Sequence, residues 1–480
     1  MPRLSELLVP PLAEDPEIGG LTADSRKVRP GDLFAALPGT RADGRDFIPD
    51  ALKRGAGAVL APRGTALGES RAALIIDDNP RRRFAQAAAR FFAPQPRTVV
   101  AVTGTNGKTS VASFARQIWT ALGLEAASLG TLGVMAPGGA IAGSLTTPDP
   151  VDLHRSLAEL ASAGVTHAAM EASSHGLDQF RLDGVTIAAA AFTNLTRDHL
   201  DYHGDMGAYW LAKRRLFTEV MAPRRAAIVN ADSPYAADLV AQCRAHWHRI
   251  LTFGAAGEAI KLVRAAPQAD GQALELMVLG VPHRLRLPLA GAFQASNAIC
   301  ALGLVLATGA EPAAAVAALE RLEGVPGRLQ RVATLASGAS IYVDYAHTPD
   351  ALATVLAALR PHAAGKLALV FGCGGDRDPG KRPMMGAIAE RDADLVIVTD
   401  DNPRSENPAT IRRAILAACP KAREIGDRRA AIRAAFAALA PGDVLLIAGK
   451  GHESGQIVGS ETLPFNDAEV ARAAAAELRP

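Results

Sequence analysis

Short apolar runs alternate with helical patterns along most of the chain, and this alternation predicts a mixed α/β fold. An apolar run bounded by turn residues is typical of a buried strand. In the first part of the chain, the strand candidates are residues 32–37, 58–60 and 74–77. An alanine-rich helix is expected over residues 80–92. Pro94-Gln95-Pro96 follows it as a linker, because two prolines suit a boundary.

A strand–helix repeat begins after this linker and continues to about residue 329. Its strand candidates are residues 99–103, 167–171, 187–193 and 226–230. They are short and mostly apolar, as expected for a parallel sheet that helices cover on both faces. Residues 260–289 differ, because Asp270-Gly271 separates two alternating segments there. This pattern predicts a small antiparallel hairpin.

The α/β pattern restarts at about residue 330, with strand candidates at residues 341–345, 367–371, 395–399 and 444–448. This part is expected to be Rossmann-like, but without a G-x-G-x-x-G fingerprint the fold alone implies no dinucleotide. The expected fold class is therefore α/β with three domains. They are an N-terminal α/β domain (1–94), a central P-loop-type domain with a mostly parallel sheet (95–329) and a C-terminal Rossmann-like domain (330–480).

Composition narrows the class of protein. A chain of 480 residues is too long for one core, and 49% hydrophobic with 21% charged residues is usual for a globular protein. The net charge of +2 gives no electrostatic case for a nucleic-acid partner. Four scattered cysteines without zinc-site spacing fit a reducing compartment. No secretory signal or membrane-spanning run is recognised, so we expect a cytoplasmic monomer that does not insert into membranes.

The strongest chemical signal is the stretch T-V-V-A-V-T-G-T-N-G-K-T-S at residues 98–110, which predicts a strand, a glycine turn and the start of a helix. Backbone N–H groups in such a loop face a phosphate chain. Lys108 adds a positive charge there, and the Thr109 hydroxyl can ligate Mg²⁺. The loop reads G-x-x-G-K-[ST], which is shorter than the usual P-loop. A chance turn is the alternative, but the flanking strand and helix favour nucleotide-phosphate binding.

Polar residues gather after two further strand candidates, where open α/β sheets place ligands. Glu171 ends one of these strands, and an acid at that place suits the Mg²⁺ that phosphoryl transfer needs. The alternative is a helix N-cap at Ser173 or Ser174, and both interpretations can hold together. The second cluster, residues 193–203, carries aspartates and histidines, one of which is a reasonable second metal ligand.

Charged residues also gather on one predicted helix and in three predicted loops. The predicted helix over residues 209–217 contains Lys213-Arg214-Arg215. From composition alone, these three residues are expected to form a solvated basic face. Loops at residues 372–378, 400–404 and 449–453 combine glycines, two arginines and Glu453. Arginines can bind a carboxylate and Glu453 an ammonium, so these loops suit an amino-acid-like ligand. Loops that merely cap strands are the alternative.

Taken together, these motifs resemble the Mur ligase family, the ATP-dependent amide ligases of peptidoglycan precursor synthesis. The resemblance covers nearly the whole chain and several motifs in one order. They are Asp24-Ser25-Arg26 and residues 30–34, 103–110, 146–148, 171–177, 194–203, 343–349, 372–378, 401–404 and 449–453. Within the family, the members that add diaminopimelate look most similar. The resemblance implies a role in cell wall biogenesis, and hence in cell shape and cell division.

The resemblance also implies site residues. ATP would be bound by Gly104, Thr105, Asn106, Gly107, Lys108, Thr109, Ser110, Asn297, Arg328, Asp344 and His347. The UDP-muramoyl dipeptide would be bound by Ser25, Thr40, Arg41, Ala42, Thr146, Thr147, Ser173, Gln179 and Arg181. Diaminopimelate would be bound by Arg377, Asp401, Asn402, Pro403, Arg404, Gly449 and Glu453. Catalysis would depend on Lys108, Glu171, His199 and Lys213. Two Mg²⁺ ions would be held by Thr109, Glu171, His199 and Lys213, the last as a CO₂-derived carbamate.

The reaction implied is transfer of the ATP γ-phosphoryl group to the D-glutamate side-chain carboxylate, followed by attack of the diaminopimelate amine on the acyl phosphate. Alternatives are a related ligase that adds L-lysine and a folylpolyglutamate synthase-like ligase. The loop at 401–404 and Asp24-Ser25-Arg26 disfavour the latter. A non-catalytic nucleotide-binding protein is a further alternative, disfavoured because all four catalytic candidates are present.

Overall fold

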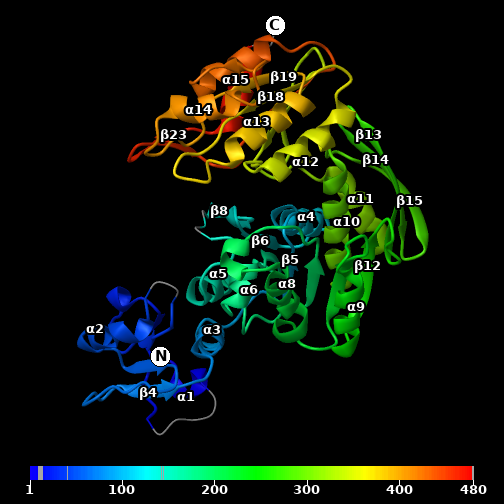
Figure 1. Ribbon diagram of the computed structural model, residues 1–480. Coiled ribbons are helices and arrows are strands. Elements are labelled where there is room, and N and C mark those ends of the chain that lie inside the picture. Colours follow the sequence, from blue (N-terminus) through cyan, green and yellow to red (C-terminus); the bar gives the residue numbers. More distant parts are fainter. Residues whose placement is uncertain (9–13, 40–41, 142, 144, 478–480) are drawn as a thin grey trace. The chain divides into compact units, whose positions relative to one another are not determined.

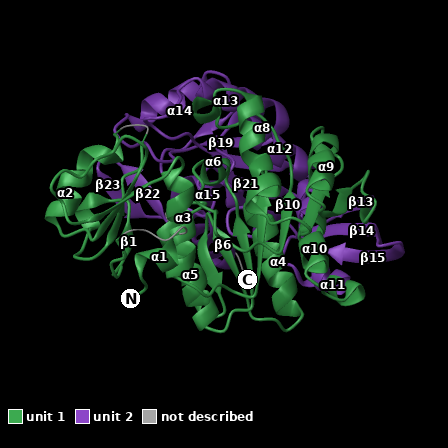
Figure 2. Ribbon diagram, turned by 90° about the horizontal axis from the view of Figure 1, so that it is seen from below, with its two compact units in different colours: residues 1–261, 299–315 green, residues 262–298, 316–480 purple. Residues whose placement is uncertain are grey.

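The computed structural model describes residues 1–8, 14–39, 42–141, 143 and 145–477. The chain divides into two compact units, residues 1–261 with 299–315 and residues 262–298 with 316–480 (Figure 2). The fold is α/β throughout, as expected. The domain boundaries expected after residues 94 and 329 stay predictions. In the described part of the chain, no helix is both long enough and apolar enough to cross a membrane.

The first unit begins with a small parallel sheet in the order β1-β2-β3-β4. Its elements are α1 (Leu4–Leu7), β1 (Leu21–Thr22), β2 (Leu33–Ala35), α2 (Ile48–Lys53), β3 (Ala58–Ala61), β4 (Ala73–Ile76) and α3 (Pro80–Phe91). Apolar residues of the strands pack against α1 and α3 in one cluster and against α2 in another. The three predicted strands and the predicted helix are confirmed, with ends shifted by at most two residues.

The larger sheet of the first unit has the order β12-β11-β10-β5-β9-β6-β7-β8 (Figure 1). Its strands are β5 (Thr98–Thr103), β6 (Ala126–Gly130), β7 (Gly133–Ala136), β8 (Gly139–Ile141), β9 (His167–Glu171), β10 (Ala189–Phe192), β11 (Ala226–Asn230) and β12 (Arg249–Gly254). The six strands from β12 to β6 are parallel, and β7 and β8 are antiparallel additions. The mostly parallel central sheet is therefore confirmed.

Helices follow the strands of this sheet. They are α4 (Lys108–Ala121), α5 (Pro150–Ser162), α6 (Ser174–Asp178), α7 (Leu200–His203), α8 (Met206–Arg215) and α9 (Ala236–Ala245). The helix predicted over residues 209–217 is α8, which starts three residues earlier and continues as a π-helix over Leu216–Val220. Because β5, β9 and β10 are parallel neighbours, the polar segments that follow them emerge at one edge of the sheet.

The second unit contains the predicted hairpin region and a second sheet. β13 (Ile260–Gln268), which begins just before this unit, is followed by β14 (Gly271–Val278) and β15 (Val281–Leu287). β14 and β15 are antiparallel, as expected for an antiparallel addition, but the turn that joins them lies at residues 279–280. The predicted turn, Asp270-Gly271, stands instead at the junction of β13 and β14. The helices α10 (Ala292–Ala307) and α11 (Pro312–Ala318) follow in the chain, and residues 299–315 of this stretch belong to the first unit.

The second sheet has the order β16-β17-β21-β18-β19-β20, in which only β16 is antiparallel. Its strands are β16 (Gln330–Thr334), β17 (Ser340–Asp344), β18 (Leu367–Phe371), β19 (Leu395–Val398), β20 (Arg423–Glu424) and β21 (Val444–Ala448). The helices are α12 (Pro349–Leu359), α13 (Lys381–Asp392), α14 (Pro408–Leu416), α15 (Arg428–Ala437) and α16 (Asp467–Glu477). One apolar cluster joins α12, α13 and α14 to the sheet, and another joins α15 and α16 to it. This is the expected Rossmann-like arrangement.

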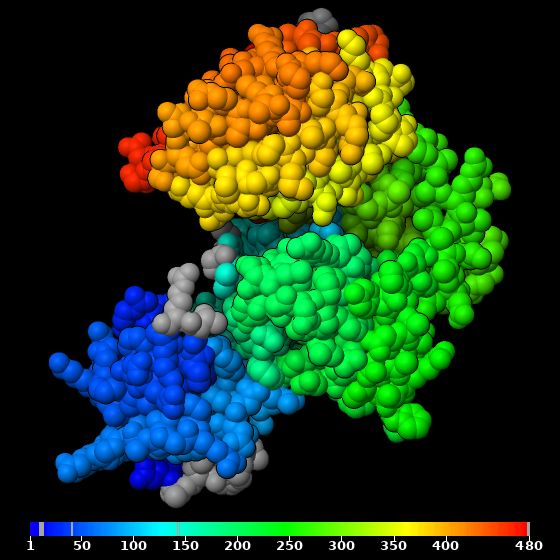
Figure 3. Space-filling model, viewed as in Figure 1, coloured from blue at the N-terminus to red at the C-terminus, as the bar shows by residue number. Residues whose placement is uncertain are grey.

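A hairpin of β22 (Gly455–Val458) and β23 (Glu461–Pro464) lies beyond β21, at the surface of this unit (red in Figures 1 and 3). It was not predicted from the sequence. Its main chain nevertheless contacts the loop at 400–404, since Arg404 forms an isolated bridge with Val458. The hairpin therefore contributes to the position of a loop with a predicted binding role.

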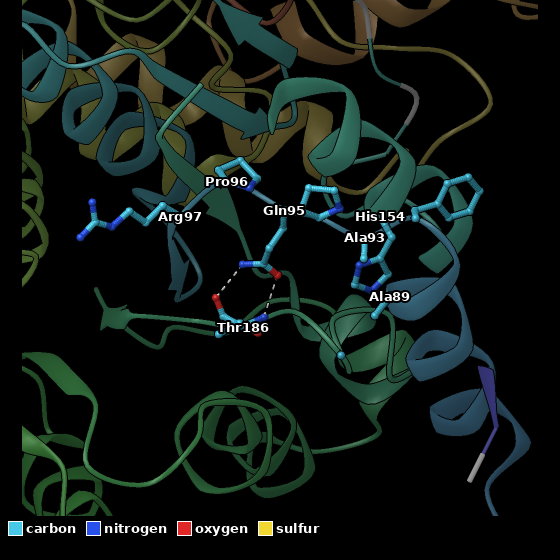
Figure 4. A pocket seen from close by; sticks show the side chains of 10 residues that line it. Ala89, Ala93, Gln95, Pro96, Arg97, His154 and Thr186 are labelled. Atoms are coloured by element: carbon cyan, nitrogen blue, oxygen red, sulfur yellow. Dashed lines mark hydrogen bonds between the residues drawn. The ribbon is translucent and has the colours of Figure 1, made fainter. Parts of the chain in front are cut away.

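A pocket of about 380 Å³ lies beside the linker between α3 and β5 (Figure 4). The side-chain amide of Gln95 crosses it, donating to the Thr186 carbonyl and accepting from the Thr186 N–H, both at 2.9 Å. His154 from α5 also lines this pocket. None of the lining residues that the structure describes is a predicted site residue, so the pocket is distinct from the predicted active site.

Candidate active site

The loop after β5 has the geometry of a phosphate cradle. Gly104 has φ 148°, and a Cβ there would collide with Thr193 Oγ1, so only glycine fits. Gly107 has φ 89° and is the residue from which α4 starts. The side chain of Lys108 turns back over the loop and donates to the carbonyls of Gly104 and Thr105 at 2.9 and 2.8 Å. The N-terminus of α4 and the lysine charge therefore meet at one loop, an arrangement suited to phosphate.

The segment after β10 holds this loop in place. Thr193 Oγ1 donates to the Asn106 carbonyl at 2.6 Å, and the Asn106 N–H donates to Asn194 Oδ1 at 3.0 Å. The hydroxyls of Thr105 and Tyr209 lie 3.1 Å apart. The loop is thus ordered by its own neighbours. Sequence reasoning assigned no role to Thr193 or Tyr209, and the only signal for Thr193 was its place at the end of a predicted strand.

Glu171 is buried at the end of β9 and points toward the phosphate loop. Its Oε2 accepts a hydrogen bond from Thr109 Oγ1 at 3.1 Å, and its Oε1 accepts one from the Thr131 N–H at 2.7 Å. Two predicted Mg²⁺ ligands, Thr109 and Glu171, are therefore in direct contact. Ser110, the next residue of the loop, is buried in the first turn of α4.

Lys213 lies inside the protein rather than on a solvated face. Its side chain is only 1% exposed, its Nζ donates to the Gly104 carbonyl at 2.7 Å, and it lies 4.4 Å from the centre of the Tyr209 ring. Burial, together with the nearby charge of Lys108, lowers the pKa of Lys213 well below its usual value. The interpretation of Lys213-Arg214-Arg215 as a solvated basic face is wrong for Lys213 and Arg215, since both are buried. Periodicity could not reveal this, because buried lysines are rare.

His199 is the most loosely placed of the predicted metal ligands. It has φ 52°, its side chain is 46% exposed, and its Nε2 lies 3.5 Å from Asp198 Oδ2. Its ring packs edge-on at 4.9 Å from the ring of His175 and 6.1 Å from that of Tyr209. The Tyr209 ring thus lies beside both His199 and Lys213. No direct contact joins His199 to Glu171 among the described hydrogen bonds and ion pairs.

The donor set fits Mg²⁺ better than a transition metal. In the described part of the chain, no three His, Cys, Asp or Glu side chains are grouped as a metal site. Mg²⁺ is usually held by one or two carboxylates together with substrate phosphates and water. One buried carboxylate and one hydroxyl beside a phosphate cradle match that pattern. These residues would therefore hold Mg²⁺ together with ATP, not as a permanent protein-only site.

Four of the nine predicted dipeptide-binding residues form one hydrogen-bonded group. Thr147 Oγ1 donates to the Glu171 carbonyl at 3.0 Å and accepts from the Ser173 N–H. Arg181 donates to the Thr147 carbonyl and to Gln179 Oε1, both at 2.7 Å. Ser173 also caps α6, so the capping interpretation is confirmed beside any binding role, whereas Ser174 is not the cap.

The remaining members of that set are placed less closely. Thr146 contacts the Thr131 hydroxyl at 3.0 Å. Ser25 begins a 3₁₀ turn in the small N-terminal sheet region, and Ala42 lies in the following loop. No hydrogen bond joins these two to the Thr147 group among the described residues. Thr40 and Arg41 lie outside the described residues.

In the second unit, the predicted nucleotide-binding residues form a compact set around the end of β17. Asp344 is buried, and its carboxylate accepts from the N–H groups of Leu329 and Ala346 at 2.6 and 2.7 Å. Burial raises the pKa of Asp344 to about 6, although the Arg328 charge and these hydrogen bonds oppose the rise.

Close to Asp344 lie the other three predicted nucleotide-binding residues of this unit, which are Asn297, Arg328 and His347. Gln294 joins two of them, because its amide nitrogen donates to the Arg328 carbonyl at 2.8 Å and its oxygen accepts from Asn297 at 3.1 Å. The Arg328 guanidinium lies 5.2 Å from the centre of the Tyr345 ring. The His347 Nδ1 is 2.8 Å from the Tyr345 carbonyl.

The loops at 400–404 and 449–453 meet through a polar cluster. Asn402 Oδ1 accepts from Lys450 Nζ at 3.0 Å, and Asn402 Nδ2 donates to Glu453 Oε2 at 2.9 Å. Lys450 is fully buried and also pairs with Glu453 at 3.0 Å. Sequence reasoning assigned Lys450 no role, although it stands within the motif at 449–453. The charge of Glu453 is therefore partly balanced by Lys450.

Arg404 is held in an unusual conformation. It has φ 51°, its N–H donates to the Ile457 carbonyl at 3.1 Å, and its guanidinium donates to the Gly375 carbonyl at 2.8 Å. A non-glycine residue in the left-handed region costs free energy, so the surrounding contacts must impose it. Arg377 has one weaker contact, 3.4 Å to the Asp376 carbonyl.

The other predicted members of this group are close to the loops. Asp401 is buried, and burial raises its pKa. Pro403 lies between Asn402 and Arg404. Gly449 has φ 112°, and a Cβ there would press on Asp401. The predicted amino-acid-binding residues are therefore brought together, with Arg377 the least constrained.

Comparisons with known proteins agree with this architecture. The chain matches the models described as Mur ligase family, catalytic domain (residues 17–92), Mur ligase middle domain (102–305) and Mur ligase, glutamate ligase domain (327–451). It is 56% identical to the UDP-N-acetylmuramoyl-L-alanyl-D-glutamate–2,6-diaminopimelate ligase of Caulobacter vibrioides, with 97% of each chain covered. It is 57% identical to the protein of the same name from Rhizobium meliloti, over 95% of this chain and 94% of the relative.

Solved structures point the same way. A structure of a UDP-N-acetylmuramoyl-L-alanyl-D-glutamate–2,6-diaminopimelate ligase superposes with a TM-score of 0.75 at 34% identity, covering 99% of both chains. The folylpolyglutamate synthase of Mycobacterium tuberculosis complexed with ADP shares the fold, with a TM-score of 0.62 at 21% identity and 77% and 91% of the two chains covered. The full-length matches at more than half identity decide the family. This chain belongs to the Mur ligase family.

Proposed function

We propose that this chain is the ATP-dependent ligase that adds meso-diaminopimelate to the D-glutamate side-chain carboxylate of UDP-N-acetylmuramoyl-L-alanyl-D-glutamate. The observation that carries the proposal is the identity of 56–57% over nearly the full length to relatives that bear this name. The site is consistent with it, because a phosphate cradle, a buried acid and a cluster suited to an amino acid are all present.

The chemistry begins with a poor electrophile, since a carboxylate does not react with an amine. Transfer of the ATP γ-phosphoryl group to this carboxylate gives an acyl phosphate, and the amine of diaminopimelate then displaces phosphate through a tetrahedral intermediate. Negative groups must converge for this, so positive charge at the site is the main catalytic requirement. Lys108 supplies it at the phosphate loop, beside the N-terminus of α4.

We infer two Mg²⁺ ions, held by Thr109, Glu171, His199 and Lys213 together with the ATP phosphates. When bound, Mg²⁺ offsets the charge of the phosphates and of the attacked carboxylate. The lowered pKa of Lys213 favours the neutral amine, the form that reacts with CO₂ to give a carbamate. A carbamate would change this buried cation into an anionic ligand, and this would explain why a lysine is buried beside the loop.

The three substrates are assigned to separate groups of residues. The N-terminal domain (1–94) and the Thr147 group bind the UDP-muramoyl dipeptide, the central domain (95–329) activates it with ATP, and the C-terminal domain (330–480) binds diaminopimelate. In the last of these, Arg404 and Arg377 suit carboxylates and Glu453 suits an ammonium. We further propose that the protein acts as a cytoplasmic monomer in cell wall synthesis, and so in cell shape and division.

ATP turnover with defined substrates tests the proposal. Phosphate release is measured with the UDP-muramoyl dipeptide and either meso-diaminopimelate or L-lysine, with and without bicarbonate. We expect release only with diaminopimelate, and faster release with bicarbonate. Equal use of L-lysine would contradict the amino-acid assignment, and turnover with folate and glutamate instead would favour the folylpolyglutamate synthase-like alternative.

A further inference from the structure

Arg428 and Asp467 form an ion pair that is completely buried in the second unit, with both side chains 0% exposed. Arg428 begins α15 and Asp467 begins α16. The contact is bidentate, because Nε and Nη2 of the arginine donate to the two carboxylate oxygens at 2.7 Å each. Burial alone would lower the pKa of Arg428, but the charge and hydrogen bonds of Asp467 raise it above its ordinary value. The guanidinium therefore remains charged inside the protein.

The same guanidinium also reaches the ends of two strands. Its Nη2 donates to the carbonyl of Ala448, the last residue of β21, at 2.9 Å. Its Nη1 donates to the carbonyl of Asp400, just beyond β19, at 3.4 Å. The Ala448 carbonyl stands directly before the loop at 449–453, and the Asp400 carbonyl belongs to the first residue of the loop at 400–404. One side chain thus connects the two loops on which most of the proposed amino-acid site is built.

The loops depend on each other for their shape. Asn402 in one loop bonds to Lys450 and Glu453 in the other, so a shift of either loop moves the proposed ammonium-binding carboxylate. Arg428 also acts on this cluster through its charge. Burial raises the pKa of Asp401, and the Arg428 charge is the largest influence that opposes this rise.

Stability alone does not account for such a pair. A buried ion pair is a weak source of stability, because desolvation of both charges offsets their attraction. Apolar side chains of similar volume would fill the same space without that cost. Apolar side chains could not, however, hold two carbonyl oxygens at the ends of separate strands. The hydrogen-bonding capacity of arginine is what distinguishes this pair from a well-packed core.

We propose that Arg428, oriented by Asp467, is a positioning residue that sets the loops at 400–404 and 449–453 for the amino-acid substrate. Arg428 does not touch the substrate. Its removal is expected to weaken use of the amino acid and to leave use of ATP unchanged. The inference rests on the proposed function, since it assumes that these loops bind the incoming amino acid.

A double variant tests this role without leaving a buried charge unpaired. Arg428→Met with Asp467→Leu replaces the ion pair by an apolar pair. The matched control is Arg433→Met with Glu477→Leu, which removes an exposed ion pair between the same two helices, α15 and α16. KM for diaminopimelate, KM for ATP, kcat and thermal unfolding are measured for both double variants and for the native protein.

We expect the Arg428/Asp467 double variant to fold and to show a KM for diaminopimelate raised about tenfold or more, because small misplacements of binding groups cost large factors in rate. KM for ATP should not change, and the control should behave as native. A folded double variant with native KM for diaminopimelate would overturn the inference. If that variant does not fold, Arg428→Lys tests the inference instead, because lysine keeps the positive charge but cannot form the bidentate contact with Asp467. It should raise KM for diaminopimelate selectively, and a native KM would count against the inference. Absence of diaminopimelate-dependent turnover in the native protein would instead refute the proposed function.

Discussion

The Nζ of Lys213 donates a hydrogen bond to the carbonyl oxygen of Gly104 at 2.7 Å, from a side chain that is almost completely buried. Lysine is rarely buried without a carboxylate partner, because desolvation of the ammonium is costly. Here the buried group lies against the phosphate loop, and burial together with the Lys108 charge lowers its pKa. We therefore expect the amine to be available for reaction with CO₂.

The first prediction concerns carbamylation of Lys213. Lys213→Met should lower kcat by about 100-fold or more, because metal ligation and charge stabilisation supply several kcal/mol to phosphoryl transfer. Incubation of the native protein with ¹³C-bicarbonate should give a carbamate signal by NMR, and this signal should be absent in the variant. Arg214→Met, on the same helix, is the control and should keep both signal and activity. An active Lys213→Met variant would exclude the role.

The second prediction concerns selection of the amino acid by Arg404. Diaminopimelate differs from lysine by a distal carboxylate, which a guanidinium can bind with two charge-assisted hydrogen bonds. Arg404→Ala should lower kcat/KM for diaminopimelate by about 100-fold, since such hydrogen bonds contribute about 1.5–3 kcal/mol each. KM for ATP should stay native. A similar loss of ATP and diaminopimelate affinity would show that the substitution merely disturbs the loop, whose backbone is already strained at φ 51°.

The architecture was largely predictable because its strands are continuous apolar runs. The predicted strands at 167–171, 226–230, 367–371 and 444–448 coincide with β9, β11, β18 and β21. Several of the unpredicted strands lack that signal, although β12 carries it in Ile-Leu-Thr-Phe and was still not predicted. β6 consists of alanine, serine, leucine and glycine without a β-branched residue, β20 has two residues, and β23 is fully exposed. Pairing with β9 on one side and β7 on the other, not local sequence, makes β6 a strand.

The site was predictable only in part. The phosphate loop follows from its own sequence, because glycines, lysine and threonine stand between a strand and a helix. The burial of Lys213 could not be predicted from the pattern of α8, where it stands beside two arginines. Contacts between residues far apart in the chain, such as Asn402 with Lys450 or Arg428 with Asp467, carry no local signal. The resemblance to a known family supplied the role of Lys213.

The third prediction concerns the pH dependence of stability through Asp344. Its pKa is about 6 in the folded protein, whereas the ordinary value of an aspartate is 3.8, so the folded state binds more protons than the unfolded state between these pH values. Stability from this group is therefore greatest below pH 3.8 and falls as the pH rises to about 6, by roughly 3 kcal/mol in total.

Asp344→Asn removes this titration and tests the sign. The free energy of unfolding of the variant relative to the native protein should increase from pH 4 to pH 6 and stay constant above it. The variant should also lose a constant amount of stability at all pH values, because an amide accepts hydrogen bonds less well than a carboxylate from the N–H groups of Leu329 and Ala346. Urea unfolding of both proteins at several pH values gives the difference. A difference that does not vary with pH would contradict the raised pKa.

The last prediction concerns the attachment of α8, the helix that carries Lys213. Two residues further on, Arg215 donates to both oxygens of Asp183 at 2.7 and 2.9 Å and to the Leu177 carbonyl of α6 at 2.9 Å. The pair is buried, with side chains 8% and 3% exposed. Asp183→Ala leaves the guanidinium without its buried partner and should lower the free energy of unfolding by about 3–5 kcal/mol.

The exposed pair of Arg155 and Asp152, with side chains 48% and 59% exposed, is the matched control, and Asp152→Ala should cost less than about 1 kcal/mol. Replacing both partners, as Asp183→Leu with Arg215→Met, should recover much of the stability because no buried charge is left unpaired. Arg82 and Glu219, which also pair with Asp183 and Arg215, are partly exposed and remain solvated. Activity should recover less than stability, since apolar side chains cannot bond the Leu177 carbonyl that joins α8 to α6. Equal recovery of stability and activity would mean that the pair stabilises the fold without orienting Lys213.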